Sequence, residues 1–401
     1  MLRFLTAGES HGRGLVVIVD GLPAGLPIDL DRLTLALRRR QGGYGRGRRM
    51  AIESDTAVVQ SGVRRGVTTG APVALLIENR DWVNWQRTMH TGPDVPEGAT
   101  GANRAPVVRP RPGHADLAGA LKFELDDVRD VLERASARET AARVAAGALA
   151  AQLLGAVGAE VTSHVRAIGE VAIPDDRVVT FAEAAALPAE APLRCVDTEV
   201  EARMIARIDA ARAAGDTLGG SFEVIVRGLP AGLGSYTQWD RKLDGRLAQA
   251  VMSIPAIKGV GIGLGAESAI RPGSRVHDEI LPAAGGGRPL RPTNRAGGLE
   301  GGVTNGEDVR VIGHMKPIAT LMQPLRSIDL TTLEDAPAAI ERSDVCAVPA
   351  AAVVGEAMVA LVLADALLER FGGDALAQIR RHMVATGEAM AQRLTRRHAP
   401  A

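Results

Sequence analysis

The stretch VIVDGLPAGL, residues 17–26, decides the fold, because it returns as VIVRGLPAGL at residues 224–233. A second pair follows in the same order, GVTTG at 66–70 and GVTNG at 302–306. In each copy a run of β-branched residues, typical of a strand, leads into a turn that contains Gly and Pro. Chance reuse of turn residues is the alternative. Two matches in one order favour a duplicated strand–turn–helix–strand unit.

This duplication organises the whole chain. The two copies span about residues 1–80 and 216–320, and a helix-rich insert occupies residues 80–215. The expected strands and helices do not alternate regularly, which favours the α+β class over a doubly wound sheet. We therefore predict a single domain over residues 1–401. Its two pseudo-symmetric halves would meet across a central pseudo-twofold axis, a natural place for a cleft.

Hydrophobic periodicity and capping signals place the elements. Helices are expected over residues 30–40, 133–155, 241–252, 349–370 and 375–396, and strands over 71–78, 221–227 and 308–313. Dense Ala and Leu predict a buried helix over 133–155, where Ser136 and Glu139 match a capping box. Residues 172–192, rich in Pro, Asp and Ala, are expected to form a surface loop without chemistry.

Composition narrows the function classes. The 47 basic and 47 acidic residues balance to zero net charge, and aromatic residues make up 2% of the chain, so neither a charged nor a stacking surface for nucleic acid is indicated. Two cysteines far apart in sequence indicate a reducing compartment. The apolar run at 15–19 is too short for a signal peptide, and the run at 347–364 falls short of the ~20 residues of a membrane span. We expect a soluble, cytoplasmic protein with neither membrane nor nucleic-acid partners.

The stretch GESHG, residues 8–12, admits two interpretations. It matches the G-x-S-x-G pattern of a hydrolase nucleophile elbow, with Ser10 as the nucleophile. Such an elbow follows several strands and takes an oxyanion amide from an earlier loop, and here too little chain precedes Ser10 to supply them. A glycine-flanked loop that presents His11 to a ligand is favoured, with an exposed structural turn as the alternative.

A second histidine lies in a stiffened loop. In RPRPGHAD, residues 109–116, two prolines restrict the approach to His114 and Gly113 allows a close turn. One such histidine is usually structural, but His11 and His114 together point to a proton-handling pair. In ERSDVCAVPA, Asp344 beside Arg342 forms a structural ion pair or, in a pocket shared with the histidines, supplies a base.

Loops of this chain are dense in groups that bind anions. The arginines concerned are Arg40, Arg46, Arg111, Arg134 and Arg342. Forked guanidiniums bind phosphate and carboxylate, and the amides at the helix start over 135–138 add a further anion site. Lys316 follows the Gly-rich stretch NRAGGLEGGVTNG. A solvated basic face or an RNA patch is the alternative, but the neutral net charge favours a small polyanionic substrate.

Two kinds of site lack their sequence signal. A G-x-G-x-x-G pattern starts at Gly43 and Gly45, but Arg48 takes the place of its third glycine, so no dinucleotide fingerprint stands. The eight histidines are scattered and no cysteine pair exists, so no metal site is expected.

Together these stretches resemble the chorismate synthase family. Its motifs are matched, in the family's order from residue 8 to about 350, by GESHG, RRRQGGYGRG, RPRPGHAD, RASARETAARVAAGA, MSIPAIKGV, NRAGGLEGGVTNG, KPIAT and RSDVCAVPA. The resemblance implies a β-α-β sandwich of two pseudo-symmetric halves, with antiparallel sheets around central helices. It also implies a carbon–oxygen lyase of the shikimate pathway, which leads to the aromatic amino acids. The reaction would be the trans-1,4 elimination of phosphate from 5-enolpyruvylshikimate 3-phosphate to give chorismate, with reduced FMN.

The resemblance also implies residue roles. His11 would protonate the departing phosphate, His114 would manage the proton near flavin N1, and Asp344 would work with flavin N5 in taking the substrate proton. The groups that would clamp the phosphate and carboxylates are Arg40, Arg46, Arg111, Arg134 and Arg342. Arg40 and Arg46 are also the positions that the family associates with NADPH.

The remaining implied roles concern FMN and assembly. FMN contacts would be Arg134, Ala135, Ser136, Pro255, Ala256, Gly301, Lys316, Pro317, Ile318, Ala319, Thr320 and Arg342. Pro255 has no amide proton, so a contact there would use its carbonyl or ring. Family members are usually homotetramers. Because no flavin-reductase domain is recognised in the 401 residues, we expect a monofunctional enzyme that relies on externally reduced FMN, with NADPH as an indirect reductant.

Overall fold

Alternation of buried and exposed residues builds the first antiparallel sheet. The computed structural model describes residues 1–47, 55–283, 287–341 and 343–395. In β2 (Gly14–Asp20), Leu15, Val17 and Val19 are buried while Val16 and Ile18 face outward, as the period of two requires. The strand order is β1-β2-β6-β3, with β1 at Arg3–Ala7, β6 at Val73–Glu78 and β3 at Ala57–Val59.

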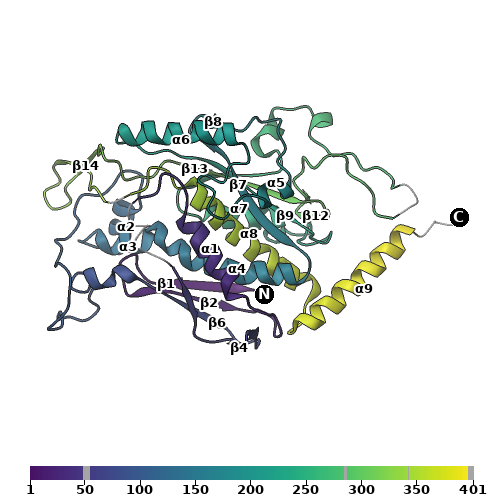
Figure 1. Cartoon of the computed structure of the whole chain (residues 1–401), viewed down its shortest axis with the longest axis horizontal. Helices are drawn as coiled ribbons and strands as arrows, with labels where there is room; N and C mark the ends of the chain where they lie inside the picture. Colours follow the sequence, from purple (N-terminus) through teal and green to yellow (C-terminus); the bar gives the residue numbers. More distant parts are fainter. Residues whose placement is uncertain (48–54, 284–286, 342, 396–401) are drawn as a thin grey trace.

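The second antiparallel sheet is buried on both faces. Its order is β10-β13-β9-β7-β8, with β10 at Ile257–Ile262, β13 at Val309–Met315, β9 at Gly220–Arg227, β7 at Glu160–Ile168 and β8 at Val171–Ala172. Strand β9 is a nearly continuous buried run, because α5 (Phe181–Ala185) and α6 (Thr198–Ala213) pack over the outer side of this sheet (Figure 1). The predicted α+β class is confirmed.

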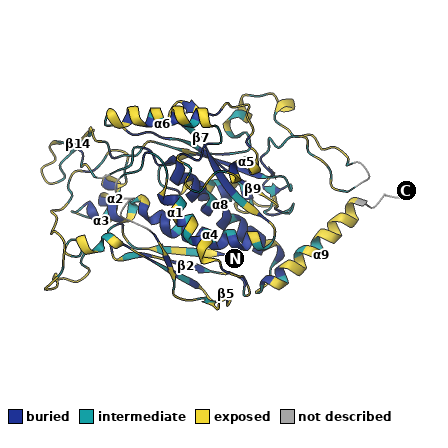
Figure 2. Ribbon diagram, in the orientation of Figure 1, coloured by how far each residue is buried: buried dark blue, intermediate teal, exposed yellow. Residues whose placement is uncertain are grey.

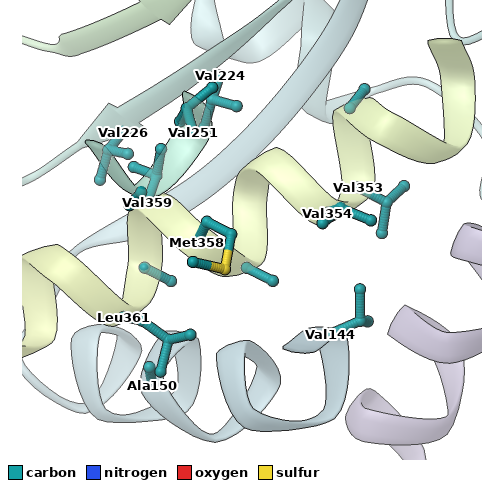
Figure 3. Close-up of a cluster of buried hydrophobic side chains, with 14 of the residues drawn as sticks. Val144, Ala150, Val224, Val226, Val251, Val353, Val354, Met358, Val359 and Leu361 are labelled. Atoms are coloured by element: carbon teal, nitrogen blue, oxygen red, sulfur yellow. The ribbon is translucent and has the colours of Figure 1, made fainter. Parts of the chain in front are cut away.

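A layer of helices lies between the two sheets. It consists of α1 (Leu30–Gln41), α4 (Thr140–Ala156), α7 (Leu243–Met252) and α8 (Val348–Phe371). Figure 2 shows α4 and α8 of this layer as largely buried, whereas α1 buries only one face. Figure 3 shows α8 packed between the valines of β9 on one side and α4 on the other. The predicted arrangement of antiparallel sheets around central helices is confirmed.

Equivalent positions of the two repeats make equivalent contacts. Thr68 Oγ1 accepts the Leu26 amide at 2.9 Å and donates to the Pro23 carbonyl at 2.6 Å. In the second repeat, Thr304 makes the same two bonds to the amide of Leu233 and the carbonyl of Pro230, both at 2.8 Å. The GVTTG and GVTNG stretches therefore pin the two GLPAGL turns in the same way.

The strand pairing extends this equivalence. The order β1-β2-β6-β3 in the first sheet corresponds to β7-β9-β13-β10 in the second. Strands β7 and β8 lie within residues 80–215, where the sequence analysis places a helix-rich insert. This range therefore contributes an inner strand and an edge strand to the second sheet as well as helices.

The other elements surround this sandwich. They are α2 (Asp116–Phe123), α3 (Arg129–Ala135), α9 (Leu376–Thr395), and the hairpins β4 (Val63–Arg64) with β5 (Val67–Thr68), β11 (Leu299–Glu300) with β12 (Val303–Thr304), and β14 (Arg326–Ile328) with β15 (Asp335–Pro337). The predicted helices over 30–40, 349–370 and 375–396 are confirmed within a residue or two.

Four local predictions are corrected. The single helix over 133–155 is broken at Ser136, whose side chain accepts the Arg138 amide and caps a 3₁₀ turn, Ala137–Glu139, ahead of α4. The predicted capping box is replaced by an ion pair between Glu139 and Arg143 at 2.8 Å. The helix expected from 241 begins at 243, after another 3₁₀ turn. The expected surface loop over 172–192 contains α5, with a capping box from Thr180.

The apolar run at 347–364 lies in a helix that is long enough to span a membrane, contrary to the prediction from the length of the run. Helix α8 has 24 residues and passes the length and hydropathy criteria for a membrane span, and it is the one described helix that does so. Within its most apolar window, 83% of the helix is buried inside the protein. Packing against α4, α1 and α7 and against the second sheet accounts for this composition.

Candidate functional site

His11 is held from three sides. The GESHG stretch connects β1 to β2, and the ring Nδ1 of His11 lies 2.8 Å from Glu133 Oε1. The main-chain amide of His11 donates to Glu133 Oε2, also at 2.8 Å. The indole of Trp85 stacks on the imidazole with a centroid distance of 3.7 Å. The side chain of Glu133, on α3, is fully buried, whereas that of His11 is 15% exposed.

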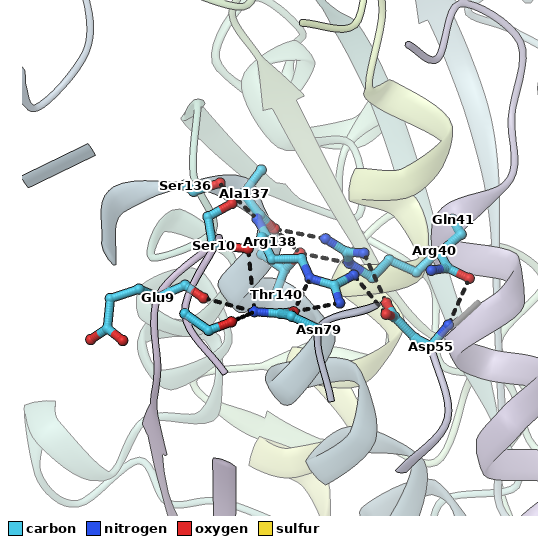
Figure 4. A network of polar contacts seen from close by, with 11 residues as sticks. Glu9, Ser10, Arg40, Gln41, Asp55, Asn79, Ser136, Ala137, Arg138 and Thr140 are labelled. Atoms are coloured by element: carbon cyan, nitrogen blue, oxygen red, sulfur yellow. Dashed lines mark hydrogen bonds and ion pairs between the residues drawn. The ribbon is translucent and has the colours of Figure 1, made fainter. Parts of the chain in front are cut away.

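Ser10 is buried in the same turn and is hydrogen-bonded there. Its residue exposure is 2%, and its hydroxyl lies 3.1 Å from Ser136 Oγ. The amide of Asn79 donates to the carbonyls of Glu9, Ser10 and Gly12 (Figure 4). The turn therefore buries its serine and presents its histidine, which favours the second interpretation of GESHG.

His114 is part of a compact ionic cluster. Its Nδ1 lies 2.5 Å from Asp116 Oδ1, and Arg111 binds both carboxylate oxygens of Asp116. Burial alone would raise the pKa of Asp116, but hydrogen bonds from His114 and Arg111 outweigh it and hold that pKa well below its usual range. Arg111 also donates to Thr320 Oγ1 at 3.1 Å. The cluster therefore links the RPRPGHAD loop to the KPIAT segment.

The segment Lys316–Thr320 lies at the centre of the candidate site. It follows β13, and Lys316 Nζ donates to the carbonyl of Gly113, next to His114. The amide of Lys316 donates to the Ala256 carbonyl at 2.9 Å. Ala256 has φ of 69°, a left-handed conformation that is costly for a residue with a Cβ. Such a strained alanine beside predicted flavin contacts is typical of a functional site.

Asp344 reaches the same region through two neighbouring loops. Its carboxylate lies 2.7 Å from Arg46 Nη1 and accepts the Gly47 amide at 2.6 Å. The next residue, Val345, accepts the Leu218 amide, and Thr217 donates to the carbonyl of Ile318. Adjacent residues thus connect Asp344 to the KPIAT segment. Arg342, a predicted FMN and anion contact, lies outside the described residues.

A hollow lies where the start of α4 faces the end of α7. It has a volume of about 220 Å³ and is lined by Arg134, Ala135, Glu139, Arg143 and Pro255. Three of these are predicted FMN contacts. Arg134 donates to Thr6 and Gly8, which places its guanidinium beside the GESHG turn.

Two predicted site residues, Arg40 and Gly301, lie against parts of the chain other than the segment Lys316–Thr320. Arg40 is 3% exposed, donates to Thr140 and Ala137, and faces Asp55 (Figure 4). Its role toward NADPH or substrate stays a prediction. Gly301 lies in the β11–β12 turn at the start of α7, whereas Pro255 and Ala256 follow the end of that helix. Gly301 therefore lies about the length of α7 away from Pro255 and Ala256 within this chain.

The structure adds three residues that the sequence analysis did not nominate: Glu133, Trp85 and Asp116. The i, i+2 spacing of His114 and Asp116 is a usable local signal. Glu133 is 122 positions from His11, and no pattern in one sequence connects them. Within the described ranges, no cluster of His, Cys, Asp and Glu is arranged to hold a metal ion.

The family model for chorismate synthase matches residues 2–368. The chain belongs to the chorismate synthase family. A chorismate synthase from Moorella thermoacetica is 60% identical over 385 residues, covering 96% of this chain and 98% of that protein. One from Leifsonia xyli subsp. xyli is 54% identical, with 98% of both chains covered.

Solved structures agree with the sequence comparison. A crystal structure of chorismate synthase aligns with a TM-score of 0.78 at 40% identity, covering 98% of both chains. The resemblance inferred from eight motifs is confirmed. The chain is thereby assigned to a family of lyases of the shikimate pathway.

Proposed function

We propose that this chain eliminates phosphate from 5-enolpyruvylshikimate 3-phosphate to give chorismate, with reduced FMN as cofactor. One observation carries the proposal: His11 and His114 lie in separate loops, and each is bound through Nδ1 to a buried carboxylate. Two oriented imidazoles joined to loops rich in cationic groups suit a reaction that expels an anion and relocates a proton.

His11 acts on the leaving group in this proposal. Because the carboxylate of Glu133 accepts hydrogen bonds only, the facing Nδ1 carries a proton. In the imidazolium form of His11 the second proton is at Nε2, from which it passes to an oxygen of the departing phosphate, and His11 is left neutral with its remaining proton on Nδ1. Nδ1 of His114 lies 2.5 Å from Asp116 Oδ1 and 3.1 Å from Arg111 Nη2. The shorter contact is to the carboxylate, which favours a proton on Nδ1, so in this proposal His114 also exchanges protons at Nε2.

Asp344 takes the ring proton of the substrate. Its two oxygens are oriented by Arg46 and by the Gly47 amide, which stabilise the carboxylate before the proton arrives. Arg46, Arg111 and Arg134 bind the phosphate and carboxylates of the substrate, together with Arg342. Arg40, which is buried behind the 3₁₀ turn, is placed to support this region from within.

The residues fit a flavin phosphate and ring system. Arg134 and Arg143 line the 220 Å³ hollow with Ala135 and Pro255, and forked guanidiniums suit a phosphate. The left-handed Ala256 and the segment Lys316–Thr320 border the path from this hollow to His114. We assign Arg134–Ser136, Pro255, Ala256 and Lys316–Thr320 to FMN binding. Reduced FMN, when bound, supplies electron density to the substrate ring as phosphate departs.

We propose a monofunctional, cytoplasmic enzyme that receives FMN already reduced, with NADPH as an indirect electron source. We also propose a homotetramer. The position of Gly301, away from the other FMN contacts of its own chain, is compatible with a role toward a neighbouring subunit.

An anaerobic assay tests the function. The protein is mixed with 5-enolpyruvylshikimate 3-phosphate and dithionite-reduced FMN, and chorismate absorbance and phosphate release are followed together. We expect both products at equal rates, and neither with oxidised FMN. His11→Ala, His114→Ala and Asp344→Ala should each lower kcat by about 10²–10⁴-fold. Absence of product from the unmodified protein under these conditions contradicts the proposal.

A further inference from the structure

We infer that Glu133 is the positioning residue of His11 and that it decides which ring nitrogen exchanges protons with the substrate. The inference rests on the role proposed above for His11. Its basis is a set of contacts made by one residue of α3 to the GESHG turn.

Glu133 binds this turn through three of its atoms. Its carbonyl accepts the amide of Ser10 at 3.0 Å. One carboxylate oxygen accepts the amide of His11, and the other faces Nδ1 of the same residue, both at 2.8 Å. The main chain and the ring of His11 are therefore fixed relative to the same carboxylate.

Because this carboxylate is buried, both of its oxygens need hydrogen-bond donors from within the protein. The Glu133 side chain has no exposed surface, so both of its oxygens depend on the His11 contacts instead of on water. An ionised carboxylate only accepts hydrogen bonds, and a main-chain amide only donates them. The remaining partner, Nδ1, must then donate as well. Glu133 thus selects the tautomer in which Nδ1 is protonated and Nε2 faces the ligand.

Trp85 restrains the orientation of the plane of the His11 imidazole. Its indole lies nearly parallel to the imidazole, with an interplanar angle of 19°. The guanidinium of Arg104 lies 4.1 Å from the centroid of the same indole. The stacked series of His11, Trp85 and Arg104 holds the plane of the imidazole, while Glu133 sets its direction within that plane.

Glu133→Gln separates positioning from folding. Glutamine has nearly the same size as glutamate. Because the main-chain amide of His11 can only donate a hydrogen bond, the single side-chain oxygen of the glutamine must accept it. The glutamine NH₂ then faces Nδ1 and donates to it. Neutral His11 is forced into the opposite tautomer, with its proton at Nε2, and the imidazolium loses its acceptor.

The first measurement is independent of catalysis. Protein labelled with ¹⁵N-histidine is studied by long-range ¹H–¹⁵N NMR, and the His11 signals are assigned by their loss in His11→Gln. We expect a protonated Nδ1 in neutral His11 of the unmodified chain and a protonated Nε2 in Glu133→Gln. A protonated Nε2 in the unmodified chain overturns the inference without reference to any variant, and so does an unchanged tautomer in Glu133→Gln.

The second measurement is the anaerobic assay. Glu133→Gln should lower kcat by about 10²–10⁴-fold, the range for a histidine held in the wrong tautomer, with little change in KM. Thermal unfolding of the variant shows whether its fold persists. If the unmodified protein shows no lyase activity, the proposed function fails, whereas the NMR result still decides the role of Glu133.

Glu201→Gln is the matched control. Glu201 also accepts two main-chain amides, from Leu193 and Cys195, but lies at the start of α6 away from the site. This variant should keep both the His11 tautomer and kcat. A kcat lowered equally in Glu133→Gln and Glu201→Gln means that the loss is a general effect of removing a carboxylate that accepts main-chain amides, and it contradicts the inference.

Discussion

At the scale of single residues, Asp116 shows how a buried charge is kept ionised. Burial opposes its charge, but His114 and Arg111 lower its pKa below the usual range. A carboxyl group with a lowered folded-state pKa stabilises the fold above the unfolded pKa of about 3.9, and this contribution is lost as pH falls toward the folded value. Acid should therefore weaken the RPRPGHAD loop and the fold together.

Asp116→Asn tests this linkage. At pH 7 the variant should be less stable by about 1–3 kcal/mol, because Arg111 and His114 lose a charged partner. The difference from the unmodified protein should shrink below about pH 4. Urea unfolding over pH 3–8 measures it. The control is Asp20→Asn, whose ion pair with Arg3 is exposed and should contribute less than about 1 kcal/mol. A pH-independent difference for Asp116→Asn contradicts the linkage.

The two cysteines give a second prediction at this scale. Both are free and buried, and burial raises the pKa of the Cys195 and Cys346 thiols to about 11. Since the thiolate is the reactive form, neither thiol should react with a disulfide reagent such as Ellman's reagent in the native protein at pH 8. Both should react in denaturant. Rapid reaction of either thiol in the native state would show an exposure that the fold does not have.

The sequence predicts individual site residues only where the local pattern is unusual. His11 and His114 stand out because glycines and prolines surround them. Glu133 and Trp85 could not be predicted, because each meets His11 through a contact between segments more than 70 positions apart. A buried glutamate within a helix resembles any other acidic residue until its partner is known.

At the scale of elements, a single glycine allows α4 and α8 to pack closely against each other. A Cβ built on Gly147 of α4 would lie 2.3 Å from the Cβ of Ala357 on α8. Gly155, two turns later on α4, has open space at the same position. The same helix thus contains one glycine required by packing and one that is not.

These glycines form a matched pair of variants. Gly147→Ala should destabilise the protein by about 1–3 kcal/mol, because α4 and α8 must move apart. Gly155→Ala should stabilise it by about 0.5–1 kcal/mol, since alanine favours the helix. Urea unfolding of both variants measures the difference. Equal effects of the two changes would mean that contact between α4 and α8 does not limit this position.

Element boundaries were predictable where periodicity acted alone. The long helices α8 and α9 follow their apolar patterns. The break at Ser136 was missed because the serine side chain competes for the amide of Arg138 and favours a 3₁₀ turn. The burial of α5 was missed because its few apolar residues gain their partners from the second sheet.

At the scale of the whole molecule, the repeated motifs predicted which strands would be equivalent. They did not predict β7, because the residues of β7 show no similarity to those of β1 although both pair with the central repeat strand. The pairing of β7 with β9 is a contact between segments distant in sequence, and the repeated motifs do not contain it. The equivalence of the two halves is thus a property of contacts more than of residue identity.

Thr68 and Thr304 test whether the halves behave independently. Each threonine is buried and joins the amide and carbonyl groups of its own GLPAGL turn. Thr68→Val and Thr304→Val should each destabilise the protein by about 1–3 kcal/mol, because valine leaves those buried groups unpaired. Thr69→Val, at an exposed neighbour, is the control and should cost about 0.5 kcal/mol or less.

The double variant then decides how the two halves are coupled. The two threonines act on separate turns and share no partner, so their effects on the free energy of unfolding should add within about 0.5 kcal/mol. Urea unfolding of the single and double variants gives the interaction energy. An interaction energy above about 1 kcal/mol would show that strain in one turn reaches the other through the helix layer. Additivity would show that each half anchors its own turn, and that the shared helices transmit little of the change.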